Sequence, residues 1–235
     1  MTKQLFNIQN FSFSYSSPND GAWQLDIPNF TIGTQELCLV SGDNMSGKTT
    51  FLNLIGGLLP LSSCVGTMHV YDHIIEHREE LLPHSILLST DDKMFPELSV
   101  WENVYIALPH FPLSQKNNLI KNLNDFLQES DIFSSDILNI ALGNLSSGGR
   151  ALVKLGRAYA SNQPLVIIDE ISSFLDAKRA SYFLDKVIAL KETGRSVIVV
   201  SHNERDRKHL LSHDETRAYH ISRKLDKSTL MKLDV

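Results

Sequence analysis

The sequence has little of the material from which disulfide frameworks and zinc centres are built. It holds only two cysteines, Cys38 and Cys64, and they have no CxxC spacing. This argues against a disulfide-rich secreted scaffold and against a cysteine zinc site, and it is typical of a reducing compartment. Basic residues are not in excess either, because 22 lysines and arginines face 27 acidic residues and the formal net charge is −5. We expect no nucleic acid partner, since a duplex-binding surface needs clustered positive charge.

Long apolar runs are also missing. No stretch approaches the roughly 20 apolar residues that a membrane helix needs. The longest runs, at 165–168 and 197–200, have the length of buried strands. The N-terminal segment has no continuous apolar core of the kind found in secretory signals. We expect a cytoplasmic chain, for which another polypeptide would supply any membrane part.

The patterns that are present predict strands first. Apolar and polar residues alternate over 6–15 and 25–32, which predicts half-exposed strands of an antiparallel edge. Short apolar runs predict further strands at 36–41, 65–71, 85–89, 165–168 and 196–200. Strand, helix and strand follow one another in the second half of the chain, and this order is typical of an α/β fold with a covered parallel sheet.

Helical spacing predicts the remaining elements. Helices are expected from Lys48 to the Gly56-Gly57 pair, over 152–160 and over 177–191. The segment between 100 and 144 is helical in character and contains no strong strand pattern. The last residues, 226–235, are polar, and we expect a small terminal helix or tail there.

The stretch GDNMSGKTT, residues 42–50, joins an expected strand to an expected helix. Glycines in such a loop let backbone N–H groups approach phosphates closely, and a helix N-terminus favours anions. A lysine at the place of Lys48 reaches the β- and γ-phosphates, and a hydroxyl residue at the place of Thr49 holds magnesium. The alternative is a glycine turn that precedes a lysine by chance. We expect a nucleotide site whose contacting residues are Gly42, Asp43, Asn44, Met45, Ser46, Gly47, Lys48, Thr49 and Thr50.

Two further segments place reactive side chains at the ends of expected strands. The run LVIIDE ends in Asp169 and Glu170, and the run SVIVVS precedes His202. Ligands bind at the carboxyl ends of the strands in parallel α/β sheets. There Asp169 can bind magnesium, Glu170 can polarise an attacking water, and His202 can contact a γ-phosphate. Each residue alone also fits an ordinary polar loop.

A second candidate anion site is NLSSGGR, residues 144–150. Two serines and two glycines precede a helix that we expect to begin near Arg150. This is a helix N-terminus of the kind that binds anions. The alternative is an ordinary turn with a helix cap.

Taken together, these segments resemble the nucleotide-binding subunit of ABC transporters, over roughly residues 6–222. Residues 42–49 resemble Walker A, LSSGG at 145–149 resembles the signature motif, and LVIIDE resembles Walker B with its catalytic glutamate. SFLD at 173–176 resembles the D-loop, and His202 matches the switch histidine. Tyr15 falls where the family has an aromatic residue that stacks on adenine.

The resemblance implies an ATPase that uses ATP and Mg²⁺. Lys48, Glu170 and His202 would be its catalytic residues, and Thr49 and Asp169 would hold the metal. Two such subunits would form a head-to-tail pair, in which Ser146 and Gly148 of one chain close the nucleotide site of the other.

The sequence also departs from the family pattern. Thr90 stands where the family has the Q-loop glutamine, which contacts magnesium and water and relays the state of the nucleotide to the membrane partner. Its hydroxyl could reach magnesium, with Asp91 and Asp92 beside it, and we expect reduced or differently coupled hydrolysis. Ser147 and Gly149 replace the usual residues of the signature. Met45 stands where glycine or serine is commoner.

The implied fold is a P-loop NTPase with a mainly parallel core sheet, an N-terminal antiparallel β subdomain and a helical insertion. We expect one ATPase domain over 1–235, with the core and antiparallel part at about 1–89 and 146–225 and the helical part at about 90–145. The implied function is to power transport through separate transmembrane permease subunits, as a homodimer on the inner face of the cell membrane. The alternative is an ABC-type ATPase or ATP-binding module with a non-transport or regulatory role and weak hydrolysis. The cargo, the direction of transport and the pairing with identical or different subunits stay open.

Overall fold

The computed structural model describes residues 3–15, 24–89, 94–108, 116–129, 136–170, 175–213 and 215–233. The chain divides into two units. The first unit consists of Met1–Leu87, Gln163–Glu170 and Ile188–Val235, and the second consists of Leu88–Asn162 and Ile171–Val187. Within the described residues, no helix is both long and apolar enough to cross a membrane.

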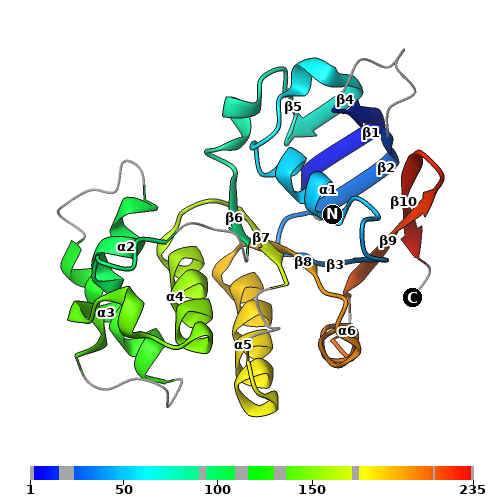
Figure 1. Cartoon of the computed structure of the whole chain (residues 1–235). Coiled ribbons are helices and arrows are strands. Elements are labelled where there is room, and N and C mark those ends of the chain that lie inside the picture. The colour runs from blue at the N-terminus through cyan, green and yellow to red at the C-terminus, as the bar shows by residue number, and fades with distance from the viewer. Residues whose placement is uncertain are drawn as a thin grey trace. The chain divides into compact units, whose positions relative to one another are not determined.

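A ten-stranded sheet runs through the first unit (Figure 1). Its strands are β1 (Gln4–Ser14), β2 (Gln24–Gly33), β3 (Leu37–Gly42), β4 (Cys64–Val70), β5 (His73–Ile74), β6 (Ser85–Ser89), β7 (Leu165–Asp169), β8 (Ser196–Val200), β9 (Arg217–Lys224) and β10 (Lys227–Leu233). Their order across the sheet is β5-β4-β1-β2-β10-β9-β3-β8-β7-β6. Strands β9, β3, β8 and β7 pair in parallel, whereas β1 pairs with β2 and β4 in antiparallel fashion. The expected α/β class with an antiparallel N-terminal part is confirmed.

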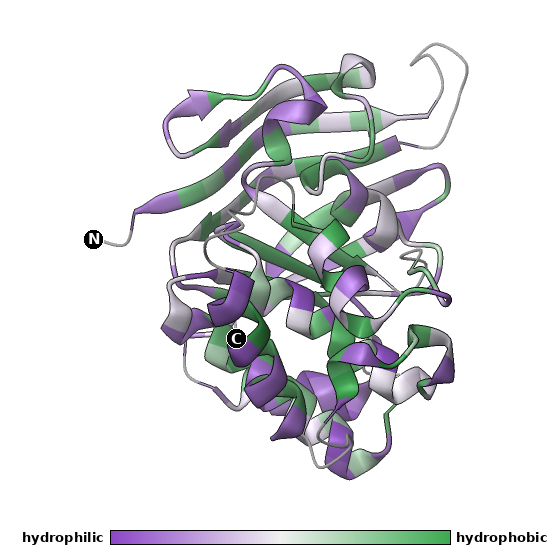
Figure 2. Ribbon diagram, turned by 90° about the vertical axis from the view of Figure 1, so that its left-hand side faces the viewer, coloured by the Kyte–Doolittle hydropathy of each residue, from purple (hydrophilic) through white to green (hydrophobic). Residues whose placement is uncertain are grey.

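The antiparallel part follows the apolar–polar alternation of its sequence. Ile8 of β1 lies opposite Phe30 of β2 and Met68 of β4, and all three side chains are buried. Figure 2 shows hydrophobic residues concentrated along the strands, with hydrophilic segments between them. Burial of one face is what fixes the register, because a slip by one residue would turn every apolar side chain outward.

The parallel part is buried on both faces and brings three strand ends to one edge. Every residue of β7 and β8 is buried, as in a covered parallel sheet. Val200 pairs with Val40 on one side and with Asp169 on the other. The residues that follow β3, β7 and β8 therefore leave the sheet at the same edge.

The C-terminal segment is a strand, so the expectation of a small helix or tail over 226–235 is wrong. Strand β10 pairs with β9 in antiparallel fashion and with β2 in parallel, where Ser228 lies opposite Leu25. Ser228 and Leu230 are buried in it, whereas Met231 and Lys232 are exposed. Alternate residues of a strand point to the same face, so burial of Ser228 and Leu230 is enough to place this mostly polar segment in the sheet.

Helices α1 (Lys48–Ile55) and α6 (Glu204–Leu211) lie in the described part of the first unit. Helix α1 buries Phe51, Leu52 and Leu54 and ends at Gly56, as the sequence predicts. Short 3-10 turns complete the described part of the chain: η2 (Leu61–Ser63), η3 (Arg78–Leu81), η5 (Ile137–Asn139), η6 (Leu142–Asn144) and η8 (Leu190–Thr193).

The second unit is helical. It contains α2 (Val100–Ile106), α3 (Lys116–Gln128), α4 (Ser147–Ala160) and α5 (Ala177–Ala189) up to residue 187. Gly156 of α4 faces Leu123 of α3 so closely that an added Cβ would lie 2.7 Å from the Leu123 Cδ1. Arg157 Nε donates to the Asn103 carbonyl oxygen of α2 at 3.1 Å, so α4 contacts both α2 and α3. The division into a core and an insertion at about 90–145 stays a prediction; α4 and most of α5 group with the second unit.

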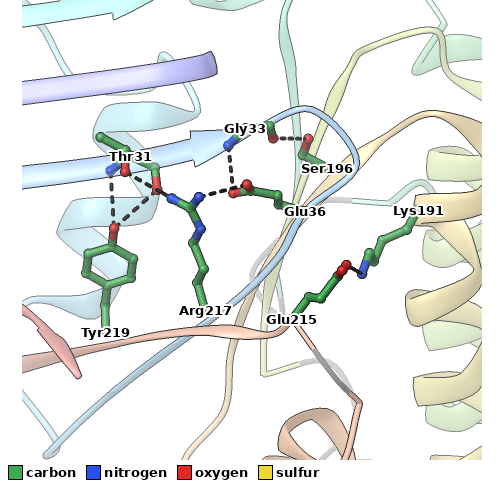
Figure 3. A network of polar contacts seen from close by, with 8 residues as sticks. All are labelled: Thr31, Gly33, Glu36, Lys191, Ser196, Glu215, Arg217 and Tyr219. Carbon is green, nitrogen blue, oxygen red and sulfur yellow. Dashed lines mark hydrogen bonds and ion pairs between the residues drawn. The ribbon is translucent and has the colours of Figure 1, made fainter. Parts of the chain in front are cut away.

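A polar network ties the antiparallel part of the first unit to its parallel part (Figure 3). Arg217 of β9 donates to Glu36 Oε1 at 2.8 Å and to Thr31 Oγ1 at 3.1 Å. The same Glu36 accepts from the Gly33 backbone N–H at 2.8 Å, and Ser196 Oγ of β8 donates to the Gly33 carbonyl oxygen at 2.7 Å. The network joins β2, β8 and β9 around the turn that leads into β3.

Candidate functional site

The loop 42–47 leaves the end of β3 and returns as helix α1. Gly47 is the residue before the helix, with a φ of 104° that side chains rarely adopt. Lys48 Nζ lies over the loop and donates to the carbonyl oxygens of Gly42 and Asp43 at 2.9 and 2.8 Å. The loop therefore curls around a buried ammonium group at the N-terminus of a helix, where an anion is favoured.

Two details of this loop fit a bound phosphate chain. The Ser46 hydroxyl is buried and makes no hydrogen bond within the described residues. A buried hydroxyl without a partner is unfavourable unless a ligand supplies one. A Cβ on Gly42 would lie 2.5 Å from the Ile221 carbonyl oxygen and 2.6 Å from Ser46 Oγ, so only glycine fits there. The residues present thus fit the phosphate chain of a nucleoside triphosphate.

A pocket of about 270 Å³ opens beside this loop. Tyr15 lines this pocket and is 61% exposed, and its hydroxyl lies 3.0 Å from Thr50 Oγ1. Phe13 supports the Tyr15 ring edge-on, with 4.9 Å between centroids. An exposed aromatic ring held at a fixed angle is suited to stacking on a nucleobase. The pocket is lined by Tyr15, Met45, Gly47, Lys48, Thr49, Thr50 and Arg223.

Thr49 and Asp169 meet across the strand ends. Thr49 Oγ1 donates to Asp169 Oδ2 at 3.4 Å, although the two residues are far apart in sequence. The described residues contain no cluster of three or more histidine, cysteine or carboxylate groups that could hold a metal by themselves. Magnesium is commonly held by one or two carboxylates together with phosphate oxygens. The hydroxyl–carboxylate pair therefore fits a magnesium ion that arrives with a nucleotide.

Glu170 and His202 form the second pair at this edge. Glu170 Oε1 lies 2.7 Å from His202 Nδ1, and the two side chains are 27% and 56% exposed. Glu170 has a φ of 53°, and its backbone N–H donates to the Val200 carbonyl oxygen at 3.1 Å. Positive φ at a residue other than glycine costs roughly 1 kcal/mol or more, and such strain gathers at functional sites.

The turn that carries His202 is fixed by a buried carboxylate. Ser201 Oγ donates to Asp206 Oδ2 at 3.2 Å and accepts from the Asn203 backbone N–H at 3.1 Å. Asp206 is fully buried and also accepts two hydrogen bonds from Arg205 at 3.1 Å. His202 therefore lies between Ser201 and Asn203, and the hydrogen bonds around Asp206 hold both of these residues.

The signature segment lies in the second unit, where it begins helix α4. The helix starts at Ser147, earlier than the expected start near Arg150, because the Ser146 hydroxyl caps it by accepting from the Gly149 backbone N–H at 3.1 Å. Gly148 and Gly149 are buried in its first turn. Arg150 donates back to the carbonyl oxygens of Leu145 and Gly143, which stiffens the turn before the helix.

Some of the expected residues lie outside the described part of the chain. These are Thr90, Asp91 and Asp92 at the Q-loop position, and the first two residues of SFLD. The strand end that leads to Thr90 is described, and Lys154 Nζ donates to the Ser89 carbonyl oxygen at 2.5 Å.

Sequence reasoning did not single out Asp206, Lys154 or Arg223. Asp206 is one of two acidic residues in the first turn of a polar helix, and only the fold shows that it is the buried one. Lys154 could have been noticed as a charge on the apolar face of α4. Arg223 belongs to no motif that the sequence reveals, because only the pairing of β9 with β3 brings it to loop 42–47.

Comparison with known proteins gives these features a context. The family model described as "ABC transporter" matches residues 25–173. The chain is similar to the L-arabinose transport ATP-binding protein AraG of Geobacillus stearothermophilus, with 25% identity over 189 residues, which are 77% of this chain and 36% of that protein. It is also similar to the molybdenum import ATP-binding protein ModC of Pseudomonas savastanoi pv. phaseolicola, with 27% identity over 212 residues, 84% of this chain and 56% of that protein.

The fold has solved counterparts as well. The dimeric post-hydrolysis state of an ATP-binding cassette bound to ADP and Pi matches with a TM-score of 0.73 at 19% identity, covering 98% of this chain and all of that chain. This chain spans only 36% and 56% of the lengths of the two relatives named above. The family match nevertheless extends over more than half of the chain and includes loop 42–47 together with Asp169 and Glu170, so the chain belongs to the ABC transporter family as an ATP-binding cassette.

Proposed function

We propose that this chain binds ATP with magnesium at loop 42–47 and hydrolyses it to power a transporter. The observation that carries the proposal is the contact between Thr49 Oγ1 and Asp169 Oδ2 at 3.4 Å. It joins the first turn of α1, which follows the loop after β3, to the end of β7, so the lysine-bearing loop and the two carboxylates lie at one edge of the sheet.

Phosphoryl transfer depends mainly on positioning and on stabilisation of charge. Lys48 and the backbone N–H groups at the start of α1 would neutralise the phosphate oxygens. Thr49 and Asp169 would hold magnesium, with Thr90 as a further candidate ligand at the Q-loop position. When bound, the metal ion supplies positive charge to the phosphate oxygens.

Glu170 would orient and deprotonate the attacking water. The carboxylate is held 2.7 Å from His202 Nδ1, which limits its rotation at the edge where the strands end. His202 would contact the γ-phosphate through its other ring nitrogen. Asp43, Asn44, Met45, Ser46 and Gly47 would contact the phosphates from the loop, and Tyr15 would stack on the adenine with Thr50 beside it.

Completion of the site would require a second ATPase subunit, most simply another copy of this chain. Ser146 and Gly148 of that copy would approach the γ-phosphate, and the pair would act on transmembrane permease subunits at the inner face of the membrane. The named relatives serve cargoes as different as a sugar and molybdenum, so the cargo is not assigned. The name of the molybdenum relative supports import as the direction.

Equilibrium binding of Mg-ATP tests the proposal. The wild-type chain and Lys48→Ala are compared, with Lys121→Ala as the control because Lys121 is an exposed lysine of α3. Loss of a charge-assisted contact to phosphate is expected to weaken binding about 10- to 100-fold in Lys48→Ala. A wild-type chain that binds no ATP, or equal affinities for all three proteins, would contradict the proposal.

A further inference from the structure

Arg223 is a cation of the pocket that none of the motifs accounts for. It lies near the end of β9, and Ile221, two positions earlier, pairs with Gly42 of β3. Because β9 and β3 are parallel and β3 ends at Gly42, Arg223 lies beyond the end of β3, at the same edge as the loop that carries Lys48. Its side chain lines the same pocket as Lys48 and Tyr15.

Two backbone carbonyl groups hold the guanidinium in place. Arg223 Nη1 donates to the Met45 carbonyl oxygen at 3.2 Å, and Nε donates to the Leu225 carbonyl oxygen at 3.1 Å. A guanidinium carries five N–H donors, so these bonds occupy only part of its capacity. The side chain is therefore oriented by the protein while donors remain for a ligand.

The charge of Arg223 also lacks the acidic partner that its neighbours have. Arg217 of the same strand is paired with Glu36 at 2.8 Å, and Lys227 of the adjoining strand is paired with Asp26. Among the described residues, no carboxylate forms an ion pair with Arg223. An unpaired, oriented cation at the wall of a pocket attracts a negatively charged ligand.

We propose that Arg223 donates hydrogen bonds to the phosphate chain of the nucleotide, as a second cation beside Lys48. This inference rests on the proposed function, because it assumes that the pocket takes a nucleotide. The planar guanidinium matches the oxygens of a phosphate group better than an ammonium group does. Arg223 would thereby connect the β9–β10 turn to the state of the nucleotide site.

The test compares dissociation constants for ATP, ADP and adenosine at low and moderate salt. The proteins are the wild type, Arg223→Gln, Arg223→Lys and Lys224→Gln. Lys224 follows Arg223 as the last residue of β9, is exposed, and does not line the pocket, so its variant removes an equal charge nearby. Melting temperatures establish that all variants fold.

Arg223→Gln is expected to weaken ATP and ADP binding about tenfold and to leave adenosine binding unchanged, because only the phosphates lose a contact. Its ATP affinity should also depend less on salt than that of the wild type. Arg223→Lys is expected to weaken binding by only about threefold, less than Arg223→Gln, because the charge remains while the planar set of donors is lost. Lys224→Gln is expected to stay within about twofold, because an exposed charge outside the pocket is screened by solvent and salt.

Three results would overturn the inference: wild-type ATP affinity in Arg223→Gln, an equal loss in Lys224→Gln, or an equal loss in Arg223→Lys with unchanged salt dependence. The last would show that Arg223 only holds the Met45 carbonyl group. A wild-type chain that binds no ATP would overturn the proposed function as well, and the two failures are thereby distinguished.

Discussion

Asp206 should control both the stability of the first unit and the placement of His202. The carboxylate is fully buried and receives hydrogen bonds from Arg205 Nε, Arg205 Nη2 and Ser201 Oγ at 3.1, 3.1 and 3.2 Å. In Asp206→Asn the charge is lost, and one of the two acceptor oxygens becomes an N–H₂ group. If that group faces Ser201, the serine hydroxyl loses its acceptor, although it still receives the Asn203 backbone N–H.

The magnitude follows from these contacts. A hydrogen bond to a charged group contributes about 1.5–3 kcal/mol, but the Arg205 side chain is 40% exposed and solvent screens its share. We therefore expect the free energy of unfolding to fall by about 1.5–3 kcal/mol in total. Because the substitution should displace His202 and leave loop 42–47 in place, kcat for ATP should fall about tenfold while KM changes little.

Urea unfolding and steady-state ATP hydrolysis measure the two effects. Glu204→Gln is the control, because Glu204 lies in the same helix but is exposed and forms an exposed ion pair with Lys208, so a change below about 0.5 kcal/mol is expected. Wild-type stability and wild-type kcat in Asp206→Asn would refute the idea that this carboxylate holds the turn.

Three other predictions test different parts of the molecule. Thr90→Gln restores the residue that the family has at that position, and we expect ATP turnover to rise several-fold; unchanged turnover and unchanged stimulation by a membrane partner would show that the position is unimportant. Burial raises the pKa of Cys38 and raises the pKa of Cys64 from 9.0 to about 12. Since the thiolate is the nucleophile, native protein at pH 8 should react with a thiol reagent about 10³-fold more slowly than an ordinary cysteine, and rapid labelling before denaturation would contradict this burial. Leu230→Ala removes a buried side chain from β10 and should lower the free energy of unfolding by about 2–4 kcal/mol; a loss below about 0.5 kcal/mol in chemical denaturation would show that the C-terminal strand adds nothing.

The first unit could be predicted from sequence where local patterns decide the structure. The strand that precedes Gly42 and the helix that starts at Lys48 are as expected, since a short apolar run and helical spacing identify them. The segment LVIIDE is also as expected, since its apolar run forms β7 and its two carboxylates, Asp169 and Glu170, lie at the end of that strand. The contact between Glu170 and His202 also follows, because parallel strands end at one edge.

The remainder depends on contacts between distant segments. Strand β10 is mostly polar, and only its pairing with β2 and β9 makes it a strand. Arg223 becomes part of the pocket through the same pairing of distant strands. Which acidic residue of α6 is buried depends on the packing of that helix, and its hydrophobic pattern is too weak to orient it.

Phosphate release by Glu170→Gln is the most direct test of the central claim that this carboxylate activates water for ATP hydrolysis. The substitution keeps the shape of the side chain and removes the base, so we expect Mg-ATP binding within about threefold of the wild type and turnover reduced at least about 100-fold. The exposed Glu204→Gln should hydrolyse ATP at the wild-type rate. Turnover close to the wild type in Glu170→Gln would show that another group activates the water, and the assignment of the site would be wrong.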